Sequence, residues 1–143
     1  ELSLSDTALY TEHLGEYTER VDCYYIMLSE DINFEDGKTI ILELLLPSHS
    51  EALNGSYSTL DREASYPEEL HYTYFPGTIE QEALRGAWYV EMVGGSVGKV
   101  MAPIMGGEIK IADGDNRSTI FTFDCYDDAS NKISGTVTTS TAL

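Results

Sequence analysis

Hydrophobic and polar residues alternate along much of this chain with the two-residue period of β-strands. The clearest runs are short, and they are rich in β-branched and aromatic residues. They cover residues 21–28, 39–46, 87–93, 108–112 and 118–125. Gly, Asp, Asn and Pro separate these runs, as is typical of turns. The pattern predicts an all-β fold, an antiparallel β-sandwich or β-barrel of about eight to ten short strands.

The run 39–46 is apolar on both of its alternating faces. One face carries Ile40, Leu42, Leu44 and Leu46. The other carries Ile41, Glu43 and Leu45, and Glu43 is its one polar residue. A strand that is apolar on both sides is covered on both sides. We therefore expect part of the second face to be buried and Glu43 to be solvated.

Weaker patterns complete the expected set of elements. Residues 2–5 alternate like a first strand, and residues 7–17 fit either a strand or a short helical turn. Three further segments are strand candidates, and one segment, broken by Gly and Pro, reads as an edge-like or bulged strand. The strand candidates are 55–59, 70–75 and 133–140, and the edge-like segment is 97–105.

Length and charge limit the possible functions. The 143 residues predict a single domain, 1–143, large enough to bury a core without disulfides or metals. Twenty-five acidic and eight basic residues give a formal net charge of −17. Such a surface repels nucleic acid and anionic lipid headgroups, and it attracts cations or cationic partners. We expect no nucleic-acid partner, and no apolar run is long enough to span a bilayer.

The two cysteines, Cys23 and Cys125, both lie in predicted strands. Cys125 shares a strand face with Phe121 and Phe123, which is a core position. We expect two buried free thiols. A disulfide is the alternative, and it would require the two strands to be neighbours.

No catalytic signature interrupts the strand pattern. His13, His49 and His71 have no second histidine or cysteine at zinc-ligand spacing. Residues 94–98, Gly-Gly-Ser-Val-Gly, match the letters of the Gly-x-Ser-x-Gly elbow, but they fit a turn between two strands and not the strand-to-helix turn that supports a Ser–His–Asp triad. Residues 94–99 lack the spacing of a phosphate-binding loop, and Gly94-Gly95 fits a hairpin turn. We therefore expect no catalytic residues, no cofactor and no metal.

A calcium site is the one alternative to the expected absence of a metal. Carboxylates and an amide gather in two predicted turns, and calcium prefers such oxygen ligands. These residues are Asp113, Asp115, Asn116, Asp127 and Asp128. Neither turn has the complete EF-hand pattern, and turn chemistry alone accounts for both.

Tyrosines are the weak candidates for ligand binding, because sugars stack on exposed aromatic faces. Trp88 shares a face with Val90, which indicates core packing. Tyr89 lies on the opposite face and is expected to be exposed. Tyr72 and Tyr74 share a face of the candidate strand 70–75. With 25 acidic residues to choose from, no carboxylate pair for glycoside hydrolysis stands out.

Several short motifs resemble one family. They are a strand ending in Pro, a Gly-x-Tyr turn, a Gly-rich strand, a strand ending in an Asp-rich turn and a final Gly-Thr-Val strand. In this chain they lie at 46–47, 55–57, 106–111, 123–128 and 133–137. Together they resemble the small, acidic, all-β domains of uncharacterised exported lipoproteins of Bacteroidetes. Residues 6–8 also match the O-glycosylation acceptor pattern of that phylum.

The resemblance implies where the protein is located and says little about how it acts. It implies an exported protein of the periplasm, outer membrane or cell surface, without enzymatic activity. Because the chain begins at Glu1 without a methionine, we expect that a preceding segment carried the lipid anchor. The leading hypothesis is a non-catalytic module that binds a glycan or a protein. The alternatives are a polysaccharide-active enzyme using carboxylate acid/base chemistry, or a purely structural domain of a surface assembly.

Overall fold

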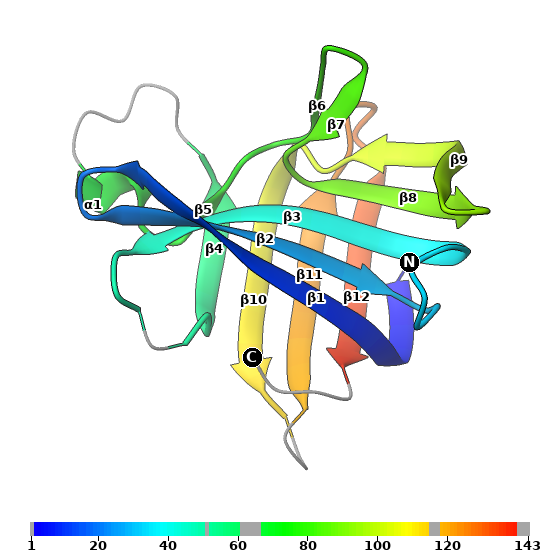
Figure 1. The fold of residues 1–143 in the computed structure, drawn as a ribbon, viewed down its shortest axis with the longest axis horizontal. Coiled ribbons are helices and arrows are strands. Elements are labelled where there is room, and N and C mark those ends of the chain that lie inside the picture. The colour runs from blue at the N-terminus through cyan, green and yellow to red at the C-terminus, as the bar shows by residue number, and fades with distance from the viewer. Residues whose placement is uncertain (1, 51, 61–66, 115–117, 140–143) are drawn as a thin grey trace.

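The computed structural model describes residues 2–50, 52–60, 67–114 and 118–139 (Figure 1). In this part of the chain nearly every element is a strand, and α1 (Pro67–Leu70) is a single helical turn. The strands are β1 (Leu2–Thr18), β2 (Val21–Ser29), β3 (Gly37–Pro47), β4 (Gly55–Thr59), β5 (Thr73–Tyr74), β6 (Thr78–Glu80), β7 (Ala83–Arg85), β8 (Trp88–Val93), β9 (Ser96–Pro103), β10 (Gly106–Asp113), β11 (Thr119–Tyr126) and β12 (Lys132–Thr139). The prediction of an all-β fold is confirmed.

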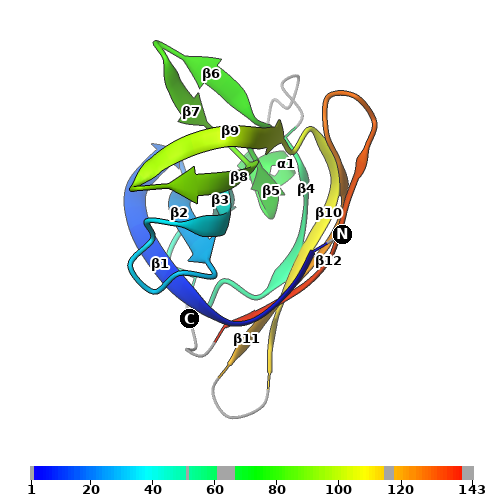
Figure 2. The same cartoon turned by 90° about the vertical axis from the view of Figure 1, so that its right-hand side faces the viewer.

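Eight of the strands close into a barrel, which Figure 2 shows nearly end-on. Their order is β2-β1-β12-β11-β10-β4-β5-β3, and pairing of β3 with β2 completes the ring. Most neighbours are antiparallel, but β1 runs parallel to β12 and β4 runs parallel to β5. The sequence left sandwich and barrel open. Closure gives each barrel strand a partner on both sides over at least part of its length and so leaves little exposed sheet edge in the ring.

Strand β1 has two different neighbours along its length. Its first residues, Leu2 to Thr7, pair with β12, and from Ala8 to Thr18 it pairs with β2. Register shifts mark the change of partner and the position of Gly15, where φ is +106°. Residues 7–17 are therefore strand, and the helical alternative for them is wrong.

The barrel interior is filled by alternating apolar residues from its strands. On β11 these are Phe121, Phe123 and Cys125, all buried, while the residues between them face outward. On β3 the inward set is Ile40, Leu42, Leu44 and Leu46, each with no exposed surface. The predicted core face of each strand is confirmed, because a period of two places every second residue inside.

The outer face of β3 is buried as well. Ile41 packs with Trp88 and Val90, because β8 pairs with the first half of β3. Leu45 packs with Val21 and Cys23 under a cover of three partly buried side chains, Leu60, Leu70 and Phe75. The expected covering of this second face is confirmed. The solvated position expected for Glu43 is wrong, since its residue is only 6% exposed.

One segment differs from the expectation of the sequence pattern, and a second segment was ambiguous in that pattern. The candidate strand 70–75 is reduced to β5, because Leu70 ends α1 and Tyr72 takes φ +58°. Residues 78–85 form the β6–β7 hairpin, a separate two-stranded sheet that projects from the barrel (Figure 1). Strand β9 ends the large sheet as an edge strand, as expected. Its turn from β8 is Gly94-Gly95, both at positive φ as tight hairpins require.

Candidate functional site

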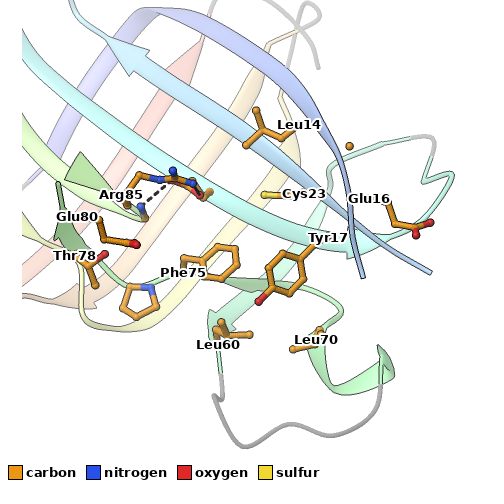
Figure 3. Close-up of a pocket in the computed structure, with 14 residues that line it drawn as sticks. Leu14, Glu16, Tyr17, Cys23, Leu60, Leu70, Phe75, Thr78, Glu80 and Arg85 are labelled. Atoms are coloured by element: carbon orange, nitrogen blue, oxygen red, sulfur yellow. Dashed lines mark hydrogen bonds and ion pairs between the residues drawn. The ribbon is translucent and has the colours of Figure 1, made fainter. Parts of the chain in front are cut away.

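A groove of about 700 Å³ lies over the outer face of β1, β2 and β3 (Figure 3). Its opposite side is formed by the segment after β4, by α1 and by the β6–β7 hairpin. The floor and walls mix apolar and charged side chains. The side chains that line it include Leu14, Glu16, Tyr17, Cys23, Glu43, Phe75, Glu80 and Arg85.

Glu43, which is buried, and Arg85, which is partly exposed, form an ion pair on one wall of the groove. Arg85 Nε lies 3.1 Å from Glu43 Oε1, and Arg85 Nη2 lies 3.4 Å from Oε2. The backbone N–H of Gly86 also donates to Oε1, at 2.9 Å. The hydrogen bond to Glu43 raises the pKa of the Arg85 guanidinium. A carboxylate at the centre of an apolar sheet face is tolerable because these donors replace water.

The Glu43–Arg85 ion pair and the indole of Trp88 together attach the β6–β7 hairpin to the barrel. The indole N–H of Trp88 donates to the carbonyl oxygens of Arg85, at 2.9 Å, and Thr78, at 3.3 Å. Trp88 itself is buried against Ile41. The hairpin wall is therefore anchored at both of its strands. The environment of Trp88 consequently depends on the position of that wall.

Apolar side chains line the middle of the groove. Phe75 is half-buried, and its ring meets the ring of Tyr17 edge-on at 5.3 Å between centroids. Tyr17 is still 51% exposed, and Leu14 on the same strand is 46% exposed. Cys23 lies in the floor, where burial raises the pKa of its thiol to about 11. Cys23 is thus a protonated packing residue at neutral pH and a poor nucleophile.

Two further carboxylates, Glu16 and Glu80, stand at the groove. Figure 3 shows them on opposite sides of the apolar residues. Both are exposed to solvent. Within the described residues, neither has a hydrogen bond or an ion pair, and Glu80 acts only at longer range on Arg85. Because Glu43 and Arg85 neutralise each other, these two residues leave the groove with negative charge.

A histidine, an aspartate and a serine meet elsewhere, but not as a catalytic triad. His13 Nε2 lies 3.0 Å from Asp22 Oδ2, and the Ser48 hydroxyl donates to Asp22 Oδ1 at 3.0 Å. A triad needs the histidine between the serine and the aspartate. Here the aspartate is in the middle, and the His13 ring stacks on Tyr24. This cluster links β1 and β2 to the segment after β3, and within it the Ser48 hydroxyl donates to Asp22 and not to His13.

The two candidate calcium turns lie at opposite ends of β11. Asp113 precedes that strand and Asp127 follows it, which places them about 25 Å apart. Asp127 accepts hydrogen bonds from the N–H groups of Asn131 and Ala129, and these lower the pKa of its carboxyl. Asp128 is exposed, and Asp115 and Asn116 lie outside the described residues. No cluster of metal-ligating side chains is found in the described residues.

The three candidate tyrosines do not form a platform. Tyr74 is completely buried and donates to the carbonyl oxygen of Gly107 at 3.0 Å. Tyr89 is partly buried against the barrel core, so its expected exposure is wrong, and its hydroxyl donates to Glu91. Tyr72 is 37% exposed and meets Tyr57 edge-on. None of the three lines the groove.

Cys23 and Cys125 are buried free thiols, as predicted, on strands that are not neighbours. Thr7, the residue of the O-glycosylation pattern, is completely buried and so inaccessible in the folded chain. Among the described residues, no helix has the length and apolar character needed to cross a membrane.

Sequence patterns did not predict the groove. Its residues come from five strands, α1 and three connecting segments, many of them distant along the chain. One signal was present: Glu43 is a lone charge in a strand that is apolar on both faces. Such a residue requires a partner, and the chain has few basic residues to supply one.

Comparison with known proteins gives no further guide. Neither a protein-family model, nor a curated protein, nor a solved structure matches this chain significantly. The function must therefore be inferred from the groove itself.

Proposed function

We propose that this protein is a non-catalytic binding module that takes a glycan or a protein segment into the outer groove. The observation that carries the proposal is the exposure of Leu14 and Tyr17 within a concave site of about 700 Å³. Ligand sites are concave and combine apolar walls with a few polar groups that orient the ligand. Burial of these two side chains by a ligand would supply the favourable free energy.

The chemistry of the groove favours binding over catalysis. A general acid or base needs a carboxylate oxygen within reach of the substrate proton. Both oxygens of Glu43 are already engaged by Arg85 and Gly86. Glu16 and Glu80 are exposed, without the apolar pocket that adapts a carboxyl group to proton transfer at neutral pH. These features support the non-catalytic reading over a polysaccharide-active enzyme.

The proposed location is the periplasm or the outer-membrane surface, with membrane attachment only through a lipid anchor. It rests on the family resemblance described above. Cell fractionation of the native host checks it directly. Recovery of the protein from the cytosol would contradict this part of the proposal.

Titration of Trp88 fluorescence tests the binding function. Trp88 is the only tryptophan, and its indole N–H is held by two residues of the groove wall. Soluble oligosaccharides and peptides are added in turn, and release of reducing ends is measured in parallel. Saturable fluorescence changes without turnover support the module. Turnover that disappears when one carboxylate is replaced would establish an enzyme instead.

A structural role in a surface assembly is the second candidate, and strand β9 favours it. This edge strand exposes Val97, Val100 and Met101. Exposed apolar edge strands are sites of pairing with other chains. Light scattering across a range of concentrations tests this role. Concentration-dependent oligomers that the Val100→Lys substitution abolishes would support it, whereas a monomer at all concentrations would contradict it.

A further inference from the structure

The groove combines three features that select one class of ligand: its charge, its apolar centre and the strand beside it. This inference rests on the proposed function, because it names what the groove binds. We propose that the ligand is an extended peptide segment in which basic side chains flank an apolar or aromatic one.

The charge of the groove selects a cationic ligand. The Arg85 charge is already matched by Glu43, at 3.1 Å and 3.4 Å. Glu16 and Glu80 have no hydrogen-bond or ion-pair partner among the described residues, and the whole chain carries −17. The negative charge of the groove would repel an anionic ligand, and it would not strengthen the binding of a neutral sugar. Lys or Arg side chains would be attracted to it.

The arrangement of the groove selects a cation with an apolar neighbour. Glu16 and Glu80 lie on opposite sides of a group formed by Tyr17, Phe75, Leu60 and Leu70 (Figure 3). An apolar or aromatic side chain seated on this group would cover the exposed part of Tyr17. Basic side chains before and after it would then reach the two carboxylates. The exposed face of Tyr17 is also suited to a cation.

The backbone beside the groove favours a peptide over a glycan. In the groove segment of β1, Gly15 and Glu16 pair with β2 on one side. Pairing of β1 with β12 stops at Thr7, so within the described residues the second edge of this part of β1 has no strand partner. An extended peptide that leaves the groove past Tyr17 can add to this edge through its own N–H and C=O groups. An oligosaccharide offers no matching ladder of donors and acceptors.

An array of random peptide octamers and an array of neutral and acidic oligosaccharides test the proposal. We expect the retained peptides to be enriched in Lys or Arg next to apolar or aromatic residues. Affinity of a retained peptide, measured by fluorescence anisotropy, should fall roughly tenfold in the E16Q/E80Q variant. The matched control E19Q/E82Q removes the same charge from exposed sites outside the groove and should bind like the wild type.

The L14S/Y17A variant separates failure of the inference from failure of the proposed function. Both side chains are about half exposed, so the fold should survive, and melting of each variant checks this. Glycan binding that L14S/Y17A abolishes would keep the binding module and overturn the peptide ligand. Peptide binding equal in E16Q/E80Q and E19Q/E82Q would overturn the role of the carboxylates. If neither array retains the protein, or if L14S/Y17A binds the retained ligand like the wild type, both the peptide ligand and the binding function of the groove are contradicted.

Discussion

Arg85 holds Glu43 through two guanidinium nitrogens, and this contact joins the β6–β7 hairpin to the outer face of the barrel. Glu43 is 8% exposed as a side chain and Arg85 is 55% exposed, so the pair spans from the sheet to the surface. On β3, Glu43 lies between two outer apolar clusters, one around Ile41 and one around Leu45. The pair therefore fixes a groove wall as well as neutralising a buried charge.

Removal of Arg85 should destabilise the protein more than removal of an exposed cation. Arg85→Ala leaves the Glu43 carboxylate buried with the Gly86 N–H as its remaining donor, at an expected cost of about 1–3 kcal/mol in the free energy of unfolding. Lys110→Ala breaks the exposed Lys110–Glu108 pair and should cost roughly 0–1 kcal/mol. Urea unfolding of both variants provides the comparison. Equal costs would show that burial of Glu43 is not maintained by Arg85.

Burial of β3 on both faces predicts equal sensitivity on both faces. Leu44→Ala opens a cavity inside the barrel, and Leu45→Ala opens one outside it, under Leu70 and Phe75. Each should lower the free energy of unfolding by about 2–5 kcal/mol. The exposed control Thr122→Ala should change it by roughly 0.5 kcal/mol or less. A small effect for Leu45→Ala alone would mean that the outer cover is loose in solution.

Both thiols should resist modification while the protein is folded. Burial raises the pKa of Cys23 and of Cys125 to about 11. At pH 8 only about one thiol in a thousand is then ionised, and the thiolate is the reactive form. Titration with a disulfide reagent should find slow reaction in buffer and two free thiols in denaturant without reductant. Finding none in denaturant would establish the disulfide. Fast reaction of Cys23 in buffer would show that the groove floor opens.

Tyr57 should make stability fall at alkaline pH. Its hydroxyl donates to the Leu53 carbonyl at 2.7 Å, and burial raises its pKa above the ordinary value. A raised folded pKa contributes stability below the unfolded pKa, about 10, and this contribution is lost as pH rises above it. Tyr57→Phe should cost about 1 kcal/mol at pH 7 through the lost hydrogen bond.

The difference between wild type and Tyr57→Phe should therefore shrink above pH about 10, because only the wild type loses the contribution of this hydroxyl. Chemical unfolding at pH 7 and at pH 11 measures it. Tyr126→Phe, at an exposed position, should match the wild type at both values. A difference for Tyr57→Phe that is constant or grows with pH would contradict the assigned burial of the hydroxyl.

Asp127 should stabilise its turn at neutral pH and lose this role in acid. The N–H groups of Asn131 and Ala129 lower its pKa, so its contribution is complete above the unfolded pKa, about 3.9, and disappears as pH falls through the folded value. The melting temperature of Asp127→Ala should be lower than that of the wild type at pH 7 and equal to it at pH 2. Asp128→Ala is the matched control. Calcium should not change the melting temperature, and a rise that Asp127→Ala removes would establish a calcium site.

Much of the fold follows from the sequence, because strand patterns are local. The alternation of Phe121, Phe123 and Cys125 identified one face of β11 as core, and both faces of β3 were recognised as apolar. The Gly94-Gly95 turn followed from the need for positive φ. These features depend on residues that are neighbours along the chain. The sequence by itself therefore determined the all-β class and most of the strands.

Only the tertiary structure decided closure, the groove and the burial of Glu43. Closure depends on pairings between strands that are distant in sequence, β1 with β12 and β4 with β10, and the alternation within single strands does not encode those pairings. Glu43 and Arg85 are 42 residues apart, so their contact is invisible to local patterns. A polar residue on a strand face is ordinarily solvated, and here a distant hairpin covers it and supplies its charge partner. The candidate site was therefore decided by long-range packing, whereas the strands that carry it were determined by local alternation.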